Sequence, residues 1–158
     1  MAASKFIKNN RLALTGASVL GLLILISLLA TAIMPFNPWE YHQAFQLPLG
    51  QHLLGTNDVG QDIFSELILS GRVSLGIGFF AATMATIIGI IVGVLAGFRR
   101  GWLDEMLMGL TDTVLIIPSL PLVILVTVYI GPGFLNIALV IGLTMWPATA
   151  RVIRSRVL

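Results

Sequence analysis

An uninterrupted apolar run near the amino terminus limits what this chain can fold into more than any other feature. Residues 12–34 read LALTGASVLGLLILISLLATAIM and contain no charged side chain. As a helix this run would reach roughly 34 Å, and the hydrocarbon core of a bilayer is about 30 Å thick. A secretory signal peptide is the alternative, because Lys5, Lys8 and Arg11 precede the run. The apolar region of such a peptide covers only about 7–15 residues, so a retained transmembrane helix is favoured.

The composition of the whole chain also indicates a membrane protein. Hydrophobic residues make up 57% of the 158 positions and charged residues only 10%, whereas about 25% of the residues in a soluble domain are charged. The chain contains no cysteine. A disulfide framework, a thiol nucleophile and a cysteine metal site are therefore excluded for these residues.

Three further apolar stretches follow the first. They cover residues 73–98, about 106–130, and 134–150. Pro118 and Pro121 lie inside the third stretch, where each would remove a helical hydrogen bond and could kink the span. The sequence therefore predicts an all-α integral membrane protein with about four transmembrane helices.

The positions of Lys and Arg predict how these spans are oriented, because short cytoplasmic loops are enriched in both residues. If the amino terminus is cytoplasmic, eight of the nine cations fall on the cytoplasmic side, and only Arg72 falls outside. The eight are Lys5, Lys8, Arg11, Arg99, Arg100, Arg151, Arg154 and Arg156. We therefore expect both termini in the cytoplasm. The predicted organisation is a first span within residues 1–34, an outer loop over 35–72, and a membrane core over 73–158.

The outer loop is expected to contain a helix that lies at the outer membrane interface. Asn57 is a candidate N-cap, and Gly71 is a candidate terminator. Two rows with four-residue spacing run between them; the acidic row is Asp58, Asp62 and Glu66, and the apolar row is Val59, Ile63 and Leu67. This pattern is typical of an amphipathic helix whose acids face water.

The same acidic row allows a chemical alternative. Three acids one turn apart share a face, so together with His52 they could form a metal or acid–base site. No basic or imidazole side chain stands inside the row, and a solvated helix face is favoured. Arg72, where the second span begins, is interpreted as an interface anchor, and Trp39 and Tyr41 suit the headgroup level.

A row of small residues in the second span predicts a close helix contact. The row has unbroken four-residue spacing and consists of Ala81, Ala85, Gly89, Gly93 and Gly97. Helices in lipid associate largely through close packing, so another helix is expected along this row. The row alone leaves open whether that helix belongs to this chain or to a partner.

Asp112 is the only ionisable residue well inside an apolar span. A charge at this depth is costly unless it is paired or hydrated. One interpretation is a relay or gate residue. The favoured one is a carboxylate that pairs with Arg99, Arg100 or a cation of a partner protein near the cytoplasmic interface.

Four segments resemble the permease subunits of peptide and nickel ABC importers. They are HLLGTNDVGQDIFSELILSGRVSLGIG, AGFRRGWLDEMLMGLTDTVLIIPSLPL, GPGFLN and WPATARVIRSRVL. The chain is most similar to the second, C-type permease, and the resemblance runs from about residue 12 to the end. The outer-loop motif of the family is carried here by Gly55, Thr56, Gly60, Asp62 and Arg72. Asn57 and Gln61 depart from that motif, and Gly109 stands where the family usually has an arginine.

The resemblance implies one subunit of a heterodimeric pore in the bacterial inner membrane. The implied partners are a companion permease, two ATPase subunits, an extracytoplasmic solute-binding protein and membrane lipid. No catalytic residue, metal, cofactor or nucleic acid is expected, and the chain has no phosphate-binding Gly-Lys-Ser/Thr loop. Because family members continue into a coupling loop and two further spans, the 158 residues resemble the first four spans of six. The alternative is therefore a truncated membrane scaffold that packs through the small-residue row, and the 158 residues alone are expected not to support ATP-driven uptake.

Overall fold

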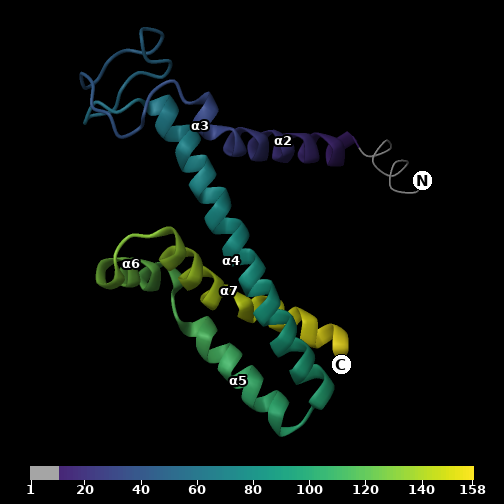
Figure 1. Cartoon of the computed structure of the whole chain (residues 1–158). Coiled ribbons are helices and arrows are strands. Elements are labelled where there is room, and N and C mark those ends of the chain that lie inside the picture. Colours follow the sequence, from purple (N-terminus) through teal and green to yellow (C-terminus); the bar gives the residue numbers. More distant parts are fainter. Residues whose placement is uncertain (1–10) are drawn as a thin grey trace. The chain divides into compact units, whose positions relative to one another are not determined.

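The structure is a computed structural model, and it describes residues 11–158 (Figure 1). Lys5 and Lys8, and with them part of the predicted charge asymmetry, lie outside the described residues. Between residues 11 and 158 the regular elements are all helices: α2 (Arg11–Leu28), α3 (Ala30–Ile33), α4 (Ile63–Arg99), α5 (Trp102–Ile116), α6 (Ser119–Ile130) and α7 (Phe134–Val157). The predicted all-α class is confirmed.

Three of these helices, α2, α4 and α7, are long and apolar enough to cross a membrane. A fourth span is present if α5 and α6 together form one broken span, since the two helices are bent by 75° relative to each other. The break lies at Ile117 and Pro118, as predicted for Pro118. The predicted loss of a helical hydrogen bond at Pro121 is wrong. Pro121 lies in the first turn of α6, where backbone N–H groups have no helical partner.

Helix α4 differs from the prediction at its start. The expected interfacial helix from Asn57 to Gly71 is wrong as a separate element. α4 begins at Ile63 and continues through Gly71 without a break to Arg99, over 37 residues. At 1.5 Å per residue it is about 55 Å long, well beyond the roughly 30 Å that a span needs. Glycine ends a helix only when it adopts a left-handed conformation, and Gly71 is not among the glycines with positive φ.

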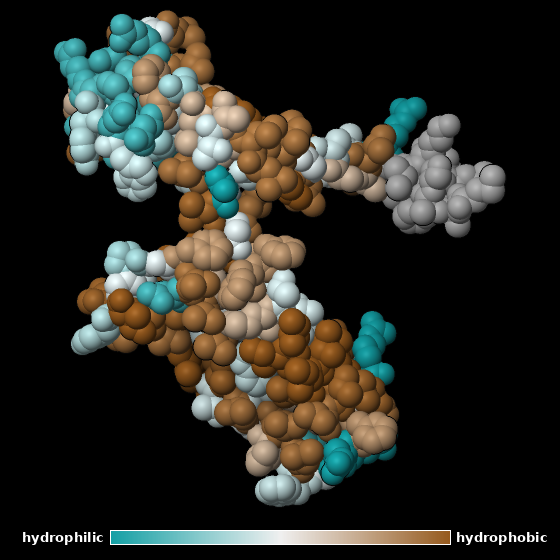
Figure 2. Space-filling model, in the orientation of Figure 1, coloured by the Kyte–Doolittle hydropathy of each residue, from teal (hydrophilic) through white to brown (hydrophobic). Residues whose placement is uncertain are grey.

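The chain divides into two compact units, one that ends at Leu75 and one from Gly76 to Leu158. In the first unit, α2 and α3 lead into the outer segment, which we define as residues 35–62, and this returns to the start of α4. Hydrophilic residues gather over the outer segment, whereas apolar residues cover the helices (Figure 2).

In the second unit, α7 packs against α4, α5 and α6. Its core consists of Ala85 on α4 with Trp146 and Ala150 on α7, and Val114 of α5 lies against them. α7 ends at Val157, seven residues beyond the predicted end at Ala150. The basic residues after position 150 are therefore part of the helix and not of a loop.

Candidate functional site

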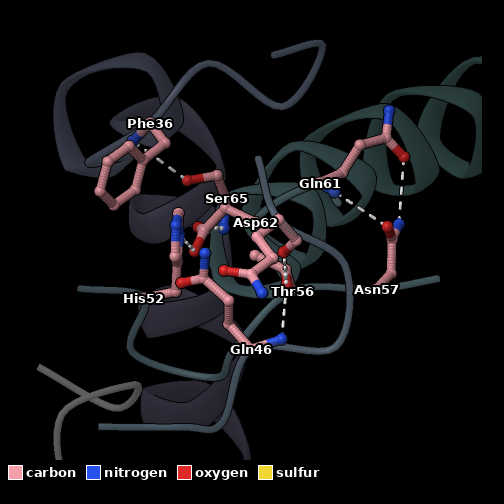
Figure 3. A network of polar contacts seen from close by, with 9 residues as sticks. Phe36, Gln46, His52, Thr56, Asn57, Gln61, Asp62 and Ser65 are labelled. Atoms are coloured by element: carbon pink, nitrogen blue, oxygen red, sulfur yellow. Dashed lines mark hydrogen bonds and ion pairs between the residues drawn. The ribbon is translucent and has the colours of Figure 1, made fainter. Parts of the chain in front are cut away.

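A buried carboxylate–imidazole pair, Asp62 and His52, lies within the network of polar contacts of the outer segment (Figure 3). Asp62 Oδ1 lies 2.8 Å from His52 Nδ1, and the two residues are only 0% and 2% exposed. Asp62 Oδ2 accepts a hydrogen bond of 2.8 Å from the backbone N–H of Ser65. Asp62 is therefore the N-cap of α4, the role predicted for Asn57. The ring of Phe36 covers His52, with ring centroids 4.4 Å apart.

The pKa of Asp62 reflects these contacts. Burial disfavours the ionised form, but hydrogen bonds from Ser65 and then from His52 outweigh it. The result is that the pKa of the Asp62 carboxyl lies below its ordinary value. These hydrogen bonds favour the ionised carboxylate, which is the form that caps the helix.

The other motif residues of the outer segment shape its turns. Thr56 Oγ1 accepts a hydrogen bond from the N–H of Gln46 and donates one to the carbonyl of Gln43. Gly55 and Gly60 have φ of +79° and +87°, in the left-handed region. A Cβ on Gly60 would lie 2.1 Å from the carbonyl oxygen of His42, so both the conformation and the space require glycine.

Asn57 and Gln61, the two positions that depart from the family motif, form a turn of their own. The side-chain oxygen of Asn57 accepts hydrogen bonds from the N–H groups of Val59 and Gln61, at 3.0 and 2.9 Å. The Asn57 amide also donates to Gln61 Oε1, at 3.1 Å. Asn57 thus closes the turn before α4, and it does not cap the helix.

The predicted solvated acidic row is therefore wrong at its centre. Asp58 and Glu66 are exposed, but Asp62 is buried against His52. The apolar row of Val59, Ile63 and Leu67 is exposed in this structure, whereas Ile68 beside that row is buried together with Ser65. The error arose because residues 57–62 form turns, and a helical period does not apply to them. Within residues 11–158, no group of three His, Asp or Glu side chains is arranged to hold a metal ion.

The row of small residues on α4 lies against α7 of the same chain. A Cβ on Gly93 would lie 2.6 Å from the carbonyl oxygen of Ala150 and 2.8 Å from Cβ of Ile153. Gly89 would contact Thr149 and Gly97 would contact Val157 in the same way. Ala81 and Ala85 continue the row and are buried. We call this contact the α4–α7 seam.

Two ion pairs join α5 to α7. Arg154 holds Asp104 with two hydrogen bonds, Nε to Oδ1 at 2.5 Å and Nη2 to Oδ2 at 2.6 Å. Arg151 Nη2 lies 2.6 Å from Asp112 Oδ1. The favoured interpretation of Asp112 as a paired carboxylate is confirmed, but its partner is Arg151 and not Arg99 or Arg100. The partner comes from α7, 39 positions away in the sequence, and no local pattern signals it.

The remaining cations lie at the surface of the described chain. Arg100 donates a hydrogen bond of 2.8 Å to the carbonyl oxygen of Leu158. Arg72, Arg99 and Arg156 are exposed. An interface-anchoring role for Arg72 and a cytoplasmic position for Arg99 and Arg156 stay predictions.

Comparison with known proteins matches two family models to separate parts of the chain. Residues 89–158 match the binding-protein-dependent transport system inner membrane component. Residues 3–51 match the N-terminal transmembrane domain of oligopeptide transport permease C. The chain belongs to this permease family.

Three relatives that match nearly the whole chain are transport permeases. The chain is 34% identical to the dipeptide transport system permease protein DppC of Alkalihalophilus pseudofirmus, over 99% of this chain and 52% of the relative. It is 32% identical to the glutathione transport system permease protein GsiD of Pectobacterium atrosepticum, over 98% and 52%. It is 35% identical to the oligopeptide transport system permease protein OppC of Bacillus subtilis, over 96% and 50%. The chain thus spans about half the length of the relatives it matches.

Proposed function

We propose that this chain forms part of the solute path in an ATP-driven importer of the bacterial inner membrane. The observation that carries this proposal is the match over 96–99% of the chain to permeases named for dipeptides, glutathione and oligopeptides. The solute proposed is therefore a peptide or a related compound. A nickel complex, which the sequence motifs also suggested, is the less favoured solute, because none of these three relatives is named for it.

The proposed assembly divides the work among several chains. A companion permease would form the other half of the path, two ATPase subunits would hydrolyse ATP, and an extracytoplasmic binding protein would deliver the solute. The role proposed for this chain is to form part of the path, which requires no bond-breaking chemistry. Several polar side chains inside the apolar helices are engaged in ion pairs and helix hydrogen bonds, such as Asp104–Arg154 and Thr111 to the carbonyl of Leu107.

The orientation of the chain is part of the same proposal. Both termini would face the cytoplasm and the outer segment would face the external side, since eight of nine cations then lie inside. The chain has no cysteine, so single cysteines at Gln46 and Ser155 can report each side. A membrane-impermeant thiol reagent added to intact cells should label position 46 and spare position 155. Labelling of position 155 alone would show that the chain has the opposite orientation, with its termini on the external side.

Uptake of a labelled dipeptide by cells tests the transport function. Deleting the native gene that encodes this chain should abolish uptake of radiolabelled dialanine or trialanine, and restoring the gene should recover it. A matched strain with an inactivated companion ATPase should behave like the deletion. Unchanged uptake of both peptides in the deletion strain would contradict the proposal.

A further inference from the structure

The end of the second unit at which α4 and α7 both finish carries several arginine side chains. A Cβ on Gly97, near the end of α4, would lie 2.8 Å from Cβ of Val157, near the end of α7. Arg100 Nη2 also donates a hydrogen bond of 2.8 Å to the carbonyl oxygen of Leu158. The last turns of the two helices therefore lie at the same end of the unit (Figure 1). Three exposed arginines, which we call the arginine end, belong to it: Arg99, Arg100 and Arg156.

The positive charges of the arginine end have no ion-pair partner within residues 11–158. The other two arginines of α7 do have such partners, Asp104 and Asp112. Arg100 bonds a neutral carbonyl group with one of the five N–H donors that a guanidinium carries. Of the two acids in the first turn of α5, Asp104 is engaged by α7, and only Glu105 is left. Three arginines thus outnumber one carboxylate, and they have donors left for an anion outside the described chain.

Exposed apolar side chains adjoin these arginines in the sequence. Phe98 directly precedes Arg99 and is 79% exposed, and Trp102, the first residue of α5, is 76% exposed. Leu95, one turn earlier on α4, is 46% exposed. Hydrophilic residues at this end of the second unit are accordingly set among apolar ones (Figure 2). A ligand that joins an anionic group to an apolar body would contact both kinds of side chain at once.

A phospholipid with an anionic headgroup has this combination, because its phosphate is linked through glycerol to acyl chains. Guanidinium groups bind phosphate with several N–H donors at once. Tryptophan is enriched where an apolar region meets a polar one at a membrane surface. Helix α4, which ends at Arg99, is also one of the helices long and apolar enough to cross a membrane. An acidic protein surface would complement the arginines but not Phe98 and Trp102.

We infer that the arginine end, together with Phe98 and Trp102, is a binding site for phospholipids whose headgroup is anionic. The arginines bind the headgroup phosphate, and the two aromatic side chains contact the glycerol and the acyl chains. Each basic residue near an anionic lipid surface strengthens attachment about fivefold. This inference goes beyond the proposed function and does not depend on it, because lipid binding requires neither a solute path nor ATP hydrolysis.

Titration of the purified native gene product with short-chain lipids tests the inference. The protein is kept in an uncharged detergent, and isothermal titration calorimetry follows the binding of dioctanoyl phosphatidylglycerol and of dioctanoyl phosphatidylcholine. The wild type should bind phosphatidylglycerol at least about 20-fold more tightly than phosphatidylcholine. The double variant Arg99→Gln/Arg156→Gln should lose about 20-fold in affinity for phosphatidylglycerol, roughly fivefold for each arginine. This variant keeps the hydrogen bond of Arg100.

A second double variant is the matched control. Arg11→Gln/Arg72→Gln also removes two exposed arginines, but both lie outside the arginine end. Its affinity for phosphatidylglycerol should equal that of the wild type. An equal loss of affinity in the two double variants would overturn the site, because the attraction would then depend on net charge alone. An unchanged affinity in Arg99→Gln/Arg156→Gln would overturn it as well.

Two competitors, inorganic phosphate and hexaglutamate, identify the class of ligand. Neither should displace phosphatidylglycerol from the wild type at a similar concentration. Displacement by inorganic phosphate would leave a phosphate site without lipid recognition, and displacement by hexaglutamate would assign the arginines to an acidic protein. Either result would overturn the lipid site. Trp102→Ala is the second variant if the arginine variant aggregates on size-exclusion chromatography; it should weaken phosphatidylglycerol binding, and an unchanged affinity would contradict the inference.

Discussion

The outer segment and the α4–α7 seam are stabilised in different ways. Hydrogen bonds within a buried polar cluster fix the outer segment, whereas glycines without side chains allow α4 and α7 to pack closely at the seam. Asp62 is held by His52 and Ser65 through specific hydrogen bonds, each 2.8 Å long. Gly89, Gly93 and Gly97 contribute no side chain, and the backbone of α4 therefore comes close to α7. Outside the membrane, an irregular loop can use a polar network to define one conformation. Between helices in lipid, burial brings little hydrophobic gain, and close approach of the two backbones stabilises one packing arrangement instead.

The largest effect is expected where a buried polar partner is removed. Asp62→Ala leaves His52 without its acceptor and α4 without its cap. An unpaired buried donor costs about 1–3 kcal/mol and a lost cap about 0.5–2 kcal/mol, so the outer segment should lose about 1.5–5 kcal/mol of stability. The measurement is the rate of limited proteolysis within residues 35–62. Asp58→Ala is the matched control, because Asp58 is an exposed acid of the same segment. Equal rates for the two variants would mean that the buried pair does not hold the segment.

The seam should respond to added volume and not to lost polarity. Gly93→Leu places a side chain where the carbonyl oxygen of Ala150 and Ile153 already lie, and overpacking typically costs about 1–3 kcal/mol. We expect a lower thermal unfolding midpoint for the purified protein in detergent. Gly78→Leu is the control on the same helix, since a Cβ there meets nothing within 4 Å. Leucine is a better helix former than glycine, so helix propensity alone would not destabilise either variant. A Gly78→Leu variant as unstable as Gly93→Leu would show that a large side chain anywhere on α4, and not the close contact at the seam, sets the effect.

The two ion pairs of α5 and α7 should differ in strength, by less than the effects above. Asp104 receives two hydrogen bonds from Arg154 and is partly buried, whereas Asp112 receives one from Arg151 and is exposed. Bidentate pairs are the stronger geometry, and exposed pairs contribute little. Asp104→Asn should therefore lower the unfolding midpoint more than Asp112→Asn does. The reverse order would show that the Asp112–Arg151 pair is less exposed in the protein than in this structure.

The smallest effect is expected from pH, and it should be confined to the outer segment. The folded-state pKa of Asp62 lies below the ordinary value of 3.8. Its stabilising contribution is therefore complete above pH 3.8 and is lost as the pH falls below 3.8 through the folded-state pKa. Pepsin cleavage within residues 35–62 should rise more steeply with acidification in the wild type than in Asp62→Asn. Parallel pH curves for the two proteins would contradict the prediction that ionised Asp62 stabilises the outer segment.

Much of the architecture was predictable from the sequence because the bilayer imposes it. A run of 23 uncharged residues and three further apolar stretches predict membrane helices, and the break at Pro118 follows from the proline's missing N–H. The small residues at positions 81 to 97 indicated a close contact, although not with which helix. These features depend on length, hydropathy and helical period, which are local properties of a chain.

Only the tertiary structure decided which polar residues meet. The buried position of Asp62 depends on His52, which turns of the outer segment bring back to the start of α4. The pairing of Asp112 with Arg151 depends on α7 folding back along α5. Both contacts join residues at separations with no helical period, 10 and 39 positions. The favoured predictions left Asp62 in water and paired Asp112 with a cation other than Arg151. The physical reason is that the environment of a charge is set by the groups around it in space, whereas a sequence pattern reports only its neighbours along the chain.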